Sequence, residues 1–183
     1  ALFGKDACFI PLQFKLTGDV LDKVNLLVLT STPEFNHYDF DDHERKAIRE
    51  FAERGGVVLA LVRATALVGA PGADNRRGES RGMLQRLLKS YGATQFNAIG
   101  KTGIKAVLVK DLEGAEPFVD PSCESYASCT EDWSPIAIVQ DDPKKVVSAV
   151  RPLGKGFLVF AQQQHASQVQ GGTFVTGFPW NRI

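Results

Sequence analysis

The stretch VNLLVLTSTPEFNHYDFDDHERKAIREFAERGGVVLALV, residues 24–62, decides the fold. Its first part, Asn25 to Thr30, is a short and continuously apolar run, which is typical of a strand buried on both faces of a parallel sheet. A second apolar run, Val57 to Val62, follows after a segment long enough for a helix. Because parallel neighbours need such a crossover connection, the stretch predicts a strand–helix–strand unit with parallel strands.

Both ends of the intervening helix carry a sequence signal. Asp41 stands three residues before Glu44, which is the spacing of a capping box: the aspartate accepts a backbone N–H bond and the glutamate reaches back. Gly55 and Gly56 follow the last apolar position, and glycine adopts the left-handed conformation of a helix end at the least cost. We therefore predict a helix between Asp41 and Gly55.

Length and charge restrict the class of protein. The 183 residues are enough for one domain with a substantial core, so we expect a single domain over residues 1–183. The 21 basic and 21 acidic residues cancel, which gives no bulk attraction to nucleic acid or to an anionic membrane. No apolar run reaches the length of a membrane span and no signal peptide is recognisable, so a cytoplasmic location is favoured over a secreted one.

The three cysteines do not form a disulfide framework. Cys8 lies in an apolar run and is expected to be a small buried residue. Cys123 and Cys129 are six residues apart in a polar segment, and they would close a small loop in an oxidising compartment or remain two free thiols in a reducing one. Both alternatives stay open at this stage.

The remaining chain alternates loops, one helix and short strands. A glycine-containing loop is expected over residues 63–81, and a helix is predicted from about Glu79 to Tyr91. Strands are predicted at residues 106–109, 136–139, 146–150 and 157–160. The last two are separated by the segment Pro152 to Gly156, which is typical of a hairpin turn. Residues 7–14 are predicted to be a short strand or edge segment.

Several motifs occur in the order found in a known superfamily. They are the apolar strand, the helix start, the glycine pair before the second strand, a helix with a Tyr-Gly-Ala end, and a late strand that leads to His165. In this chain they occupy residues 25–33, 40–44, 51–59, 87–93 and 153–160. This order resembles the class I glutamine amidotransferase-like superfamily, and within it the ThuA-like group and the GIFT domains of intraflagellar-transport and oligosaccharyltransferase subunits.

The resemblance and the strand pattern together predict the fold class. We expect an α/β, flavodoxin-like three-layer domain with a mainly parallel central sheet and an antiparallel C-terminal strand pair.

The same resemblance implies that the catalytic set is incomplete. The superfamily places a nucleophilic cysteine after the second strand of the unit, and this chain has Arg63-Ala64-Thr65 there. His165 matches the superfamily histidine, but Ser167 stands where its acidic partner is expected. A histidine cannot activate a nucleophile that is absent, so glutaminase activity is not expected. His165 remains a weak catalytic candidate, and whether the chain is an enzyme stays open.

Two groups of residues are candidate binding sites. The first is a weak metal candidate at the helix start, because carboxylates and imidazoles suit several divalent ions; the alternative interpretation is a capped helix terminus, and no metal or other cofactor is expected. Its members are His37, Asp39 and His43. The second lies beyond the second strand and the last strand, where ligands bind in open α/β sheets and arginines could hold a carboxylate or phosphate. Its members are Arg63, Thr65, Asn75, Arg76, Arg77, Arg81 and His165.

Two functional hypotheses follow. The first is a non-catalytic binding or assembly domain on an amidotransferase-like scaffold that lacks the nucleophilic cysteine. It would bind a protein partner, associate with itself, or take a small polar ligand such as a sugar. The alternative is a hydrolase or isomerase acting on a carbohydrate or small carboxylate in a cleft with His165 and Arg63.

Overall fold

A computed structural model of the chain describes residues 15–30, 39–62, 83–98, 104–108, 118–120, 125–140 and 142–162. The helices in these ranges are α1 (Gly18–Leu21), α2 (Asp42–Glu53) and α3 (Met83–Lys89). The strands are β1 (Leu26–Thr30), β2 (Val57–Val62), β3 (Ala93–Ala98), β4 (Ile104–Leu108), β5 (Phe118–Asp120), β6 (Ser125–Cys129), β7 (Ser134–Val139), β8 (Asp142–Leu153) and β9 (Gly156–Gln162). The predicted segment at residues 7–14 lies outside the described ranges.

The predicted strand–helix–strand unit is confirmed. β1 and β2 pair in parallel, with Leu26 opposite Val57, and α2 connects them. The capping box is present, because the Asp41 side chain accepts from the Glu44 N–H at 2.9 Å and the Glu44 side chain accepts from the Asp41 N–H at 3.1 Å. At the other end, Gly55 adopts φ 121°. The N–H groups of the two glycines bond back to the last turn of the helix, the pattern of a Schellman motif.

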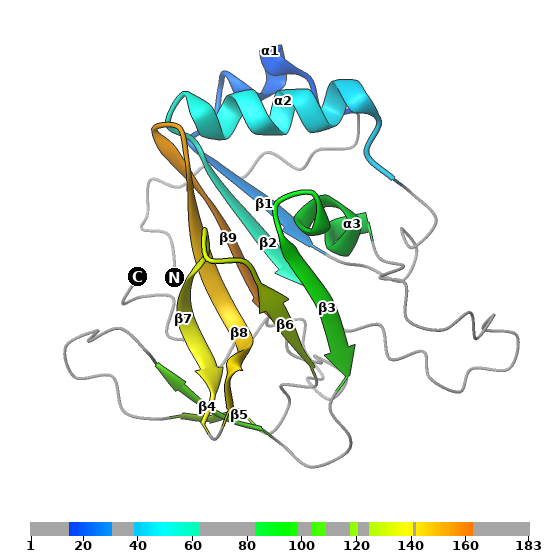
Figure 1. Ribbon diagram of the computed structural model, residues 1–183. Helices are drawn as coiled ribbons and strands as arrows, with labels where there is room; N and C mark the ends of the chain where they lie inside the picture. The colour runs from blue at the N-terminus through cyan, green and yellow to red at the C-terminus, as the bar shows by residue number, and fades with distance from the viewer. Residues whose placement is uncertain are drawn as a thin grey trace, which may run out of the picture.

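The predicted fold class is wrong. The described strands form one mixed, curled sheet in the order β1-β2-β9-β8-β7-β4-β5 (Figure 1). Outside this order, β6 pairs with β8, and β3 pairs with β6. Only the pairs β1–β2 and β2–β9 are parallel, and every other described pair is antiparallel. The chain is therefore mostly β within these ranges, and neither the flavodoxin-like architecture nor the three-layer α/β class describes it.

The reason lies in the length of the later connections. β6 and β7 are separated by residues 130–133, β7 and β8 by residues 140–141, and β8 and β9 by residues 154–155. Parallel neighbours need a crossover of about a dozen residues or more, so connections this short can only join antiparallel strands. β8 runs in the direction opposite to β2. The tight turn after β8 reverses the chain, so β9 lies beside β2 and runs parallel to it.

The predicted C-terminal hairpin is confirmed and is longer than expected. β8 and β9 pair from Ser148 opposite Ala161 to Leu153 opposite Gly156, and Gly154 takes φ 62° in the two-residue turn. The tip of the hairpin lies against the end of α2, where the Lys155 N–H donates to the Glu53 carbonyl at 2.9 Å. Figure 1 shows this turn beside the C-terminal end of α2.

One side of the sheet carries the main core. Side chains of alternate positions on β1, β2 and β9 pack against the apolar side of α2, with α1 and α3 adding leucines. The members of this core include Leu27, Leu29, Val58, Ala60, Leu158, Phe160, Ile48, Phe51, Leu21, Leu84, Leu87 and Leu88. Each described helix therefore lies over the same side of the parallel strands.

β8 produces the curl. Along one edge it pairs with β7, and along the other it pairs with β9 from Ser148 onwards and with β6 at Val146 opposite Ala127. The second edge of β8 is thus shared between two neighbours, so the sheet divides there into a β9–β2–β1 branch and a β6–β3 branch. The α3 helix contacts β2, the middle strand of the first branch, and β3, the outer strand of the second.

Candidate functional site

The three parallel strands end at one edge of the sheet. Thr30 of β1 lies opposite Leu61 of β2, and Val62 of β2 lies opposite Gln162 of β9. Arg63 directly follows Val62 in the sequence, and His165 comes three residues after Gln162. The register therefore places the exits of the two predicted site segments next to each other. The predicted site residues that lie outside the described ranges are His37, Arg63, Thr65, Asn75, Arg76, Arg77, Arg81 and His165.

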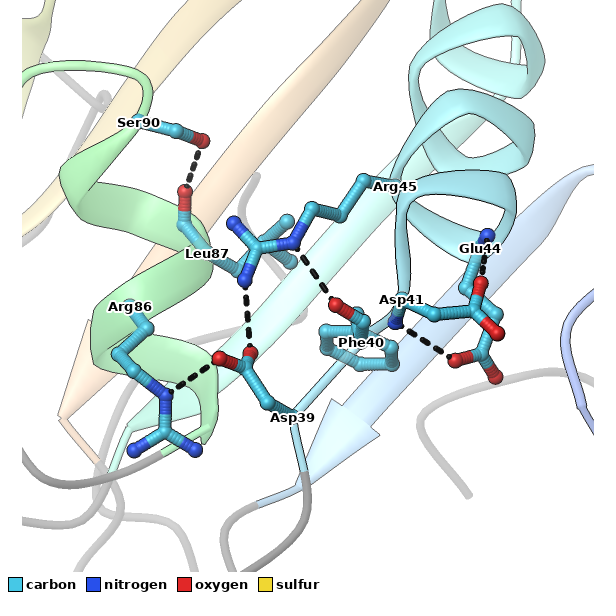
Figure 2. Close-up of polar contacts among 8 residues, drawn as sticks. All are labelled: Asp39, Phe40, Asp41, Glu44, Arg45, Arg86, Leu87 and Ser90. Atoms are coloured by element: carbon cyan, nitrogen blue, oxygen red, sulfur yellow. Dashed lines mark hydrogen bonds and ion pairs between the residues drawn. The ribbon is translucent and has the colours of Figure 1, made fainter.

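Asp39 connects the start of α2 to α3 at this end of the molecule (Figure 2). Its Oδ1 accepts from Arg45 Nη2 at 2.8 Å and its Oδ2 accepts from Arg86 Nε at 2.9 Å. Arg45 is oriented further by a 2.8 Å bond from its Nε to the Phe40 carbonyl. The side chains of Asp39, Arg45 and Arg86 keep 42%, 33% and 30% of their exposure, so solvent screens the ion pairs and their stabilisation is modest.

This geometry favours a structural role for Asp39 over metal binding. Both of its oxygens face guanidinium donors, and a metal ion would have to displace them. His43 is exposed on the first turn of α2. In the part of the chain that the structure describes, no group of three histidine, cysteine, aspartate or glutamate side chains could hold a metal ion.

The start of α2 is stabilised by its own capping box and by contacts with residues 15 and 16, which precede α1. Glu44 is 2% exposed, and its Oε1 accepts from the Leu16 N–H at 3.2 Å. Lys15 Nζ lies 2.6 Å from Asp41 Oδ2. The hydrogen bond from Lys15 and the backbone N–H of Glu44 lower the pKa of the Asp41 carboxyl below its ordinary value. The capped-helix interpretation of this acidic segment is confirmed.

The carbonyl of Tyr91 organises the region after α3. It accepts from Trp133 Nε1 at 2.8 Å and also from Arg151 Nη1, and Arg151 in turn lies 3.2 Å from Asp132. Trp133 is 3% exposed and meets the Phe160 ring edge-on, with centroids 5.2 Å apart. Trp133 therefore packs within the core, and burial raises the pKa of the Tyr91 hydroxyl. These contacts fix the β6–β7 turn against the end of α3.

The side of β1, β2 and β9 opposite α2 is the second surface of interest, and we call it the open face. Two rows of apolar side chains cross it in register: one from Leu26 through Val57 to Phe157, and one from Val28 through Leu59 to Val159. None of these six belongs to the core cluster under the helices, although Val159 is itself buried at 8% exposure and Leu26, Val57 and Leu59 are half-buried. Phe157 is 44% exposed and Val28 is 40% exposed, the two large hydrophobic side chains that are exposed within the described ranges.

Sequence reasoning missed the open face. Continuous apolar strands indicated burial on both sides, as in a sheet with helices on both faces. In the structure, all helices of the described segments contribute to the core on one side. The available signal was the short spacing of β6, β7, β8 and β9, whose connections are too short to hold a helix.

Cys129 lies at the end of β6 as a free thiol. Burial raises its pKa to about 12, so the reactive thiolate form is scarce near neutral pH. Cys8 and Cys123 are outside the described ranges.

Comparison with known proteins relates the chain to others through its fold. No protein-family model matches it, and no curated protein sequence matches it. The N-terminal domain of mmIFT52 has a TM-score of 0.57 and 16% identity, over 82% of this chain and 71% of that one. The cytoplasmic protein STM1381 from Salmonella typhimurium LT2 has a TM-score of 0.54 and 13% identity, over 85% and 68%. The cytoplasmic protein STM3548 from Salmonella typhimurium has 0.52 and 13%, over 93% and 72%.

Identities this low show a shared fold and nothing about activity. Within the described ranges, no helix is long and apolar enough to cross a membrane.

Proposed function

We propose that this chain is a non-catalytic assembly domain that binds a protein partner through the open face. The observation that carries the proposal is the exposure of Phe157 and Val28 on a face whose two register rows are entirely apolar. A contiguous apolar patch of this kind on a folded domain is typical of a protein-binding surface, because leaving it in water costs free energy that a partner recovers.

The sequence supports the non-catalytic part of the proposal. Arg63-Ala64-Thr65 follows β2 at the place where the class I glutamine amidotransferase-like superfamily carries its cysteine nucleophile. The resemblance to that superfamily remains part of this proposal, without the flavodoxin-like architecture. A scaffold that has lost its nucleophile can keep a binding role, because fold and function separate readily. One structural neighbour, the N-terminal domain of mmIFT52, is by its name a module within a longer protein.

Site-specific photo-crosslinking tests the proposal. p-Benzoylphenylalanine replaces Phe157 in one variant, and Glu50, exposed on the helix side of the molecule, in a control variant. After irradiation in a native extract, the protein captured from position 157 is identified by mass spectrometry, purified, and titrated against the wild-type chain and Phe157→Ser.

The expected result is a defined adduct from position 157 that is absent from position 50, and a Phe157→Ser chain that binds the purified partner at least tenfold more weakly. Equal adduct patterns from both positions, or unchanged binding by Phe157→Ser, would refute the proposal.

The register at the carboxyl edge favours a second candidate, a hydrolase or isomerase acting on a carbohydrate or small carboxylate. Val62 and Gln162 are paired, and in the sequence they precede Arg63 and His165 by one and three residues. Under this alternative, hydrolysis of a panel of glycosides and esters should depend on pH in the histidine range, and His165→Ala should remove that limb of the profile. A panel with no activity that responds to His165→Ala rules it out.

A further inference from the structure

The described part of the sheet has three edge strands, β1, β3 and β5, and only β1 lacks features that hinder pairing with another strand. β5 is three residues long, and β3 carries Thr94, Gln95 and Asn97 with a register irregularity between Thr94 and Asn97. Short length, polar residues and bulges are the usual means by which proteins prevent edge-to-edge pairing. β1 has five residues in a regular register with β2, without a bulge, a charge or a proline, and its one polar residue is Thr30 at its end.

The outer edge of β1 offers hydrogen-bonding groups at alternate residues. The Asn25 carbonyl accepts from the Val57 N–H at 3.0 Å, so Asn25 directs its backbone groups toward β2. Because backbone direction alternates along a strand, Leu26, Val28 and Thr30 direct theirs outward. In the described ranges, β2 is the one strand that pairs with β1.

We propose that the outer edge of β1 pairs with β1 of a second copy of this chain in an antiparallel, two-fold arrangement centred on Val28. This inference rests on the proposed assembly function and adds to it a second copy of the chain at the strand edge beside the open face. Val28 is the middle residue of β1, so the two-fold axis would place Val28 opposite its counterpart, Leu26 opposite Thr30, and Leu27 opposite Leu29.

Geometry and charge favour a second copy as the occupant. With the axis perpendicular to the sheet, the row from Val28 through Leu59 to Val159 continues into the same row of the partner and joins the two open faces. The exposed Val28 is then covered by its counterpart. β1 itself is uncharged, and the 21 basic and 21 acidic residues cancel, so no net repulsion opposes the approach of two copies.

Hydrodynamic mass is the first test. At tens of micromolar, light scattering after size exclusion should give twice the 20.0 kDa of one chain. Val28→Lys should weaken the dimer at least tenfold, because two like charges would meet at the axis. Ser134→Lys, the same change at an exposed residue of β7, should leave the dimer intact. Circular dichroism melting confirms that each variant is folded.

Disulfide trapping tests the register, in a chain whose three native cysteines are alanine. Directly opposed residues of an antiparallel pair have Cα atoms about 5.5 Å apart, within the range of a disulfide. Oxidation should therefore link Val28→Cys to itself. Leu26→Cys alone should not link, because its counterpart lies four residues along the strand, about 13 Å away. Leu26→Cys mixed with Thr30→Cys should link.

A monomer at every concentration, or equal trapping at Leu26 and Val28, would overturn the inference. If the chain is monomeric but position 157 still captures a different protein, the inference fails and the proposed function stands. If the dimer is absent and position 157 also captures nothing above the position 50 control, both fail.

Discussion

Gly156 is the position at which a single methyl group tests the packing of the hairpin under α2. A Cβ at this residue would lie 2.1 Å from the Gly56 carbonyl oxygen, 2.5 Å from the Ala52 carbonyl oxygen and 2.9 Å from the carbonyl carbon of Gly55. All three are backbone atoms, so no side chain can rotate away. Gly156→Ala therefore requires the β8–β9 turn to move away from the end of α2.

The cost has two parts. Overpacking against a rigid wall costs about 1–3 kcal/mol. The movement also weakens the bonds from the Lys155 N–H to Glu53 and from the Phe157 N–H to Gly56, worth about 1 kcal/mol each. We expect Gly156→Ala to lower the free energy of unfolding by roughly 3–5 kcal/mol. With a urea m-value of about 2 kcal/mol/M, the midpoint should fall by roughly 2 M.

Gly18→Ala is the matched control for the added methyl group. A Cβ at Gly18 meets nothing within 4 Å, and Gly18 lies in α1, where alanine is favoured over glycine by up to about 1 kcal/mol. We expect this variant to be unchanged or slightly more stable. A Gly156→Ala midpoint within about 0.3 M of the wild type, a change of about 0.6 kcal/mol, would refute the docking of the hairpin on α2.

The remaining predictions concern the contacts around α2, α3 and β6. Asp39→Ala should lower the free energy of unfolding by at most about 1 kcal/mol, because its ion pairs are partly exposed to solvent. Leu87→Ala in the core should lower it by about 2–5 kcal/mol. Urea titration measures both, and a larger loss for Asp39→Ala than for Leu87→Ala would mean that the ion pairs of Asp39, and not the core, hold α3 in place. Trp133→Phe should cost about 1–2 kcal/mol, because the Tyr91 carbonyl keeps the donor of Arg151; an unchanged melting temperature would contradict the bond. The lowered pKa of Asp41 means that its stabilisation is present above the ordinary carboxyl pKa and is lost as the pH falls through its lowered folded value; the melting temperatures of wild type and Asp41→Asn should therefore differ at neutral pH and converge in strong acid, and a constant difference would refute this. The thiol of Cys129 should react with a disulfide reagent at pH 8 much more slowly in the native chain than after unfolding, because burial raises its pKa to about 12; equal rates in the two states would contradict the raised pKa.

Local signals predicted the local structure well. The spacing of Asp41 and Glu44, and the glycines at 55 and 56, fixed the two ends of α2, because capping depends on residues next to each other in the chain. The turn at Gly154 was predicted for the same reason. In each case the determining interaction spans six residues or fewer, so the sequence contains it directly.

The arrangement of the sheet was not predicted, because it depends on contacts between distant residues. An apolar run such as Val57–Val62 has the same pattern whether its neighbours are parallel or antiparallel. The division of β8 between β9 and β6 depends on strand pairing across the whole domain. The resemblance to a superfamily with mainly parallel sheets then favoured the flavodoxin-like α/β class, which is wrong.

For the candidate site, sequence reasoning identified polar residues after the strand ends and overlooked apolar ones on the strands themselves. The exposure of Phe157 follows from which side of the sheet the helices occupy, and that is a property of the folded chain. The pairing of Asp39 with Arg86 joins positions 47 residues apart and has no local signature.

The most direct test of the central claim is hydroxyl-radical labelling of Phe157 in the free chain and in its purified complex with the partner captured from position 157. If the open face is the binding surface, the labelling rate of Phe157 should fall several-fold on assembly, while that of His43, exposed on α2, should not change. A Phe157 rate that is the same in both states, with protection found at His43, would contradict the account.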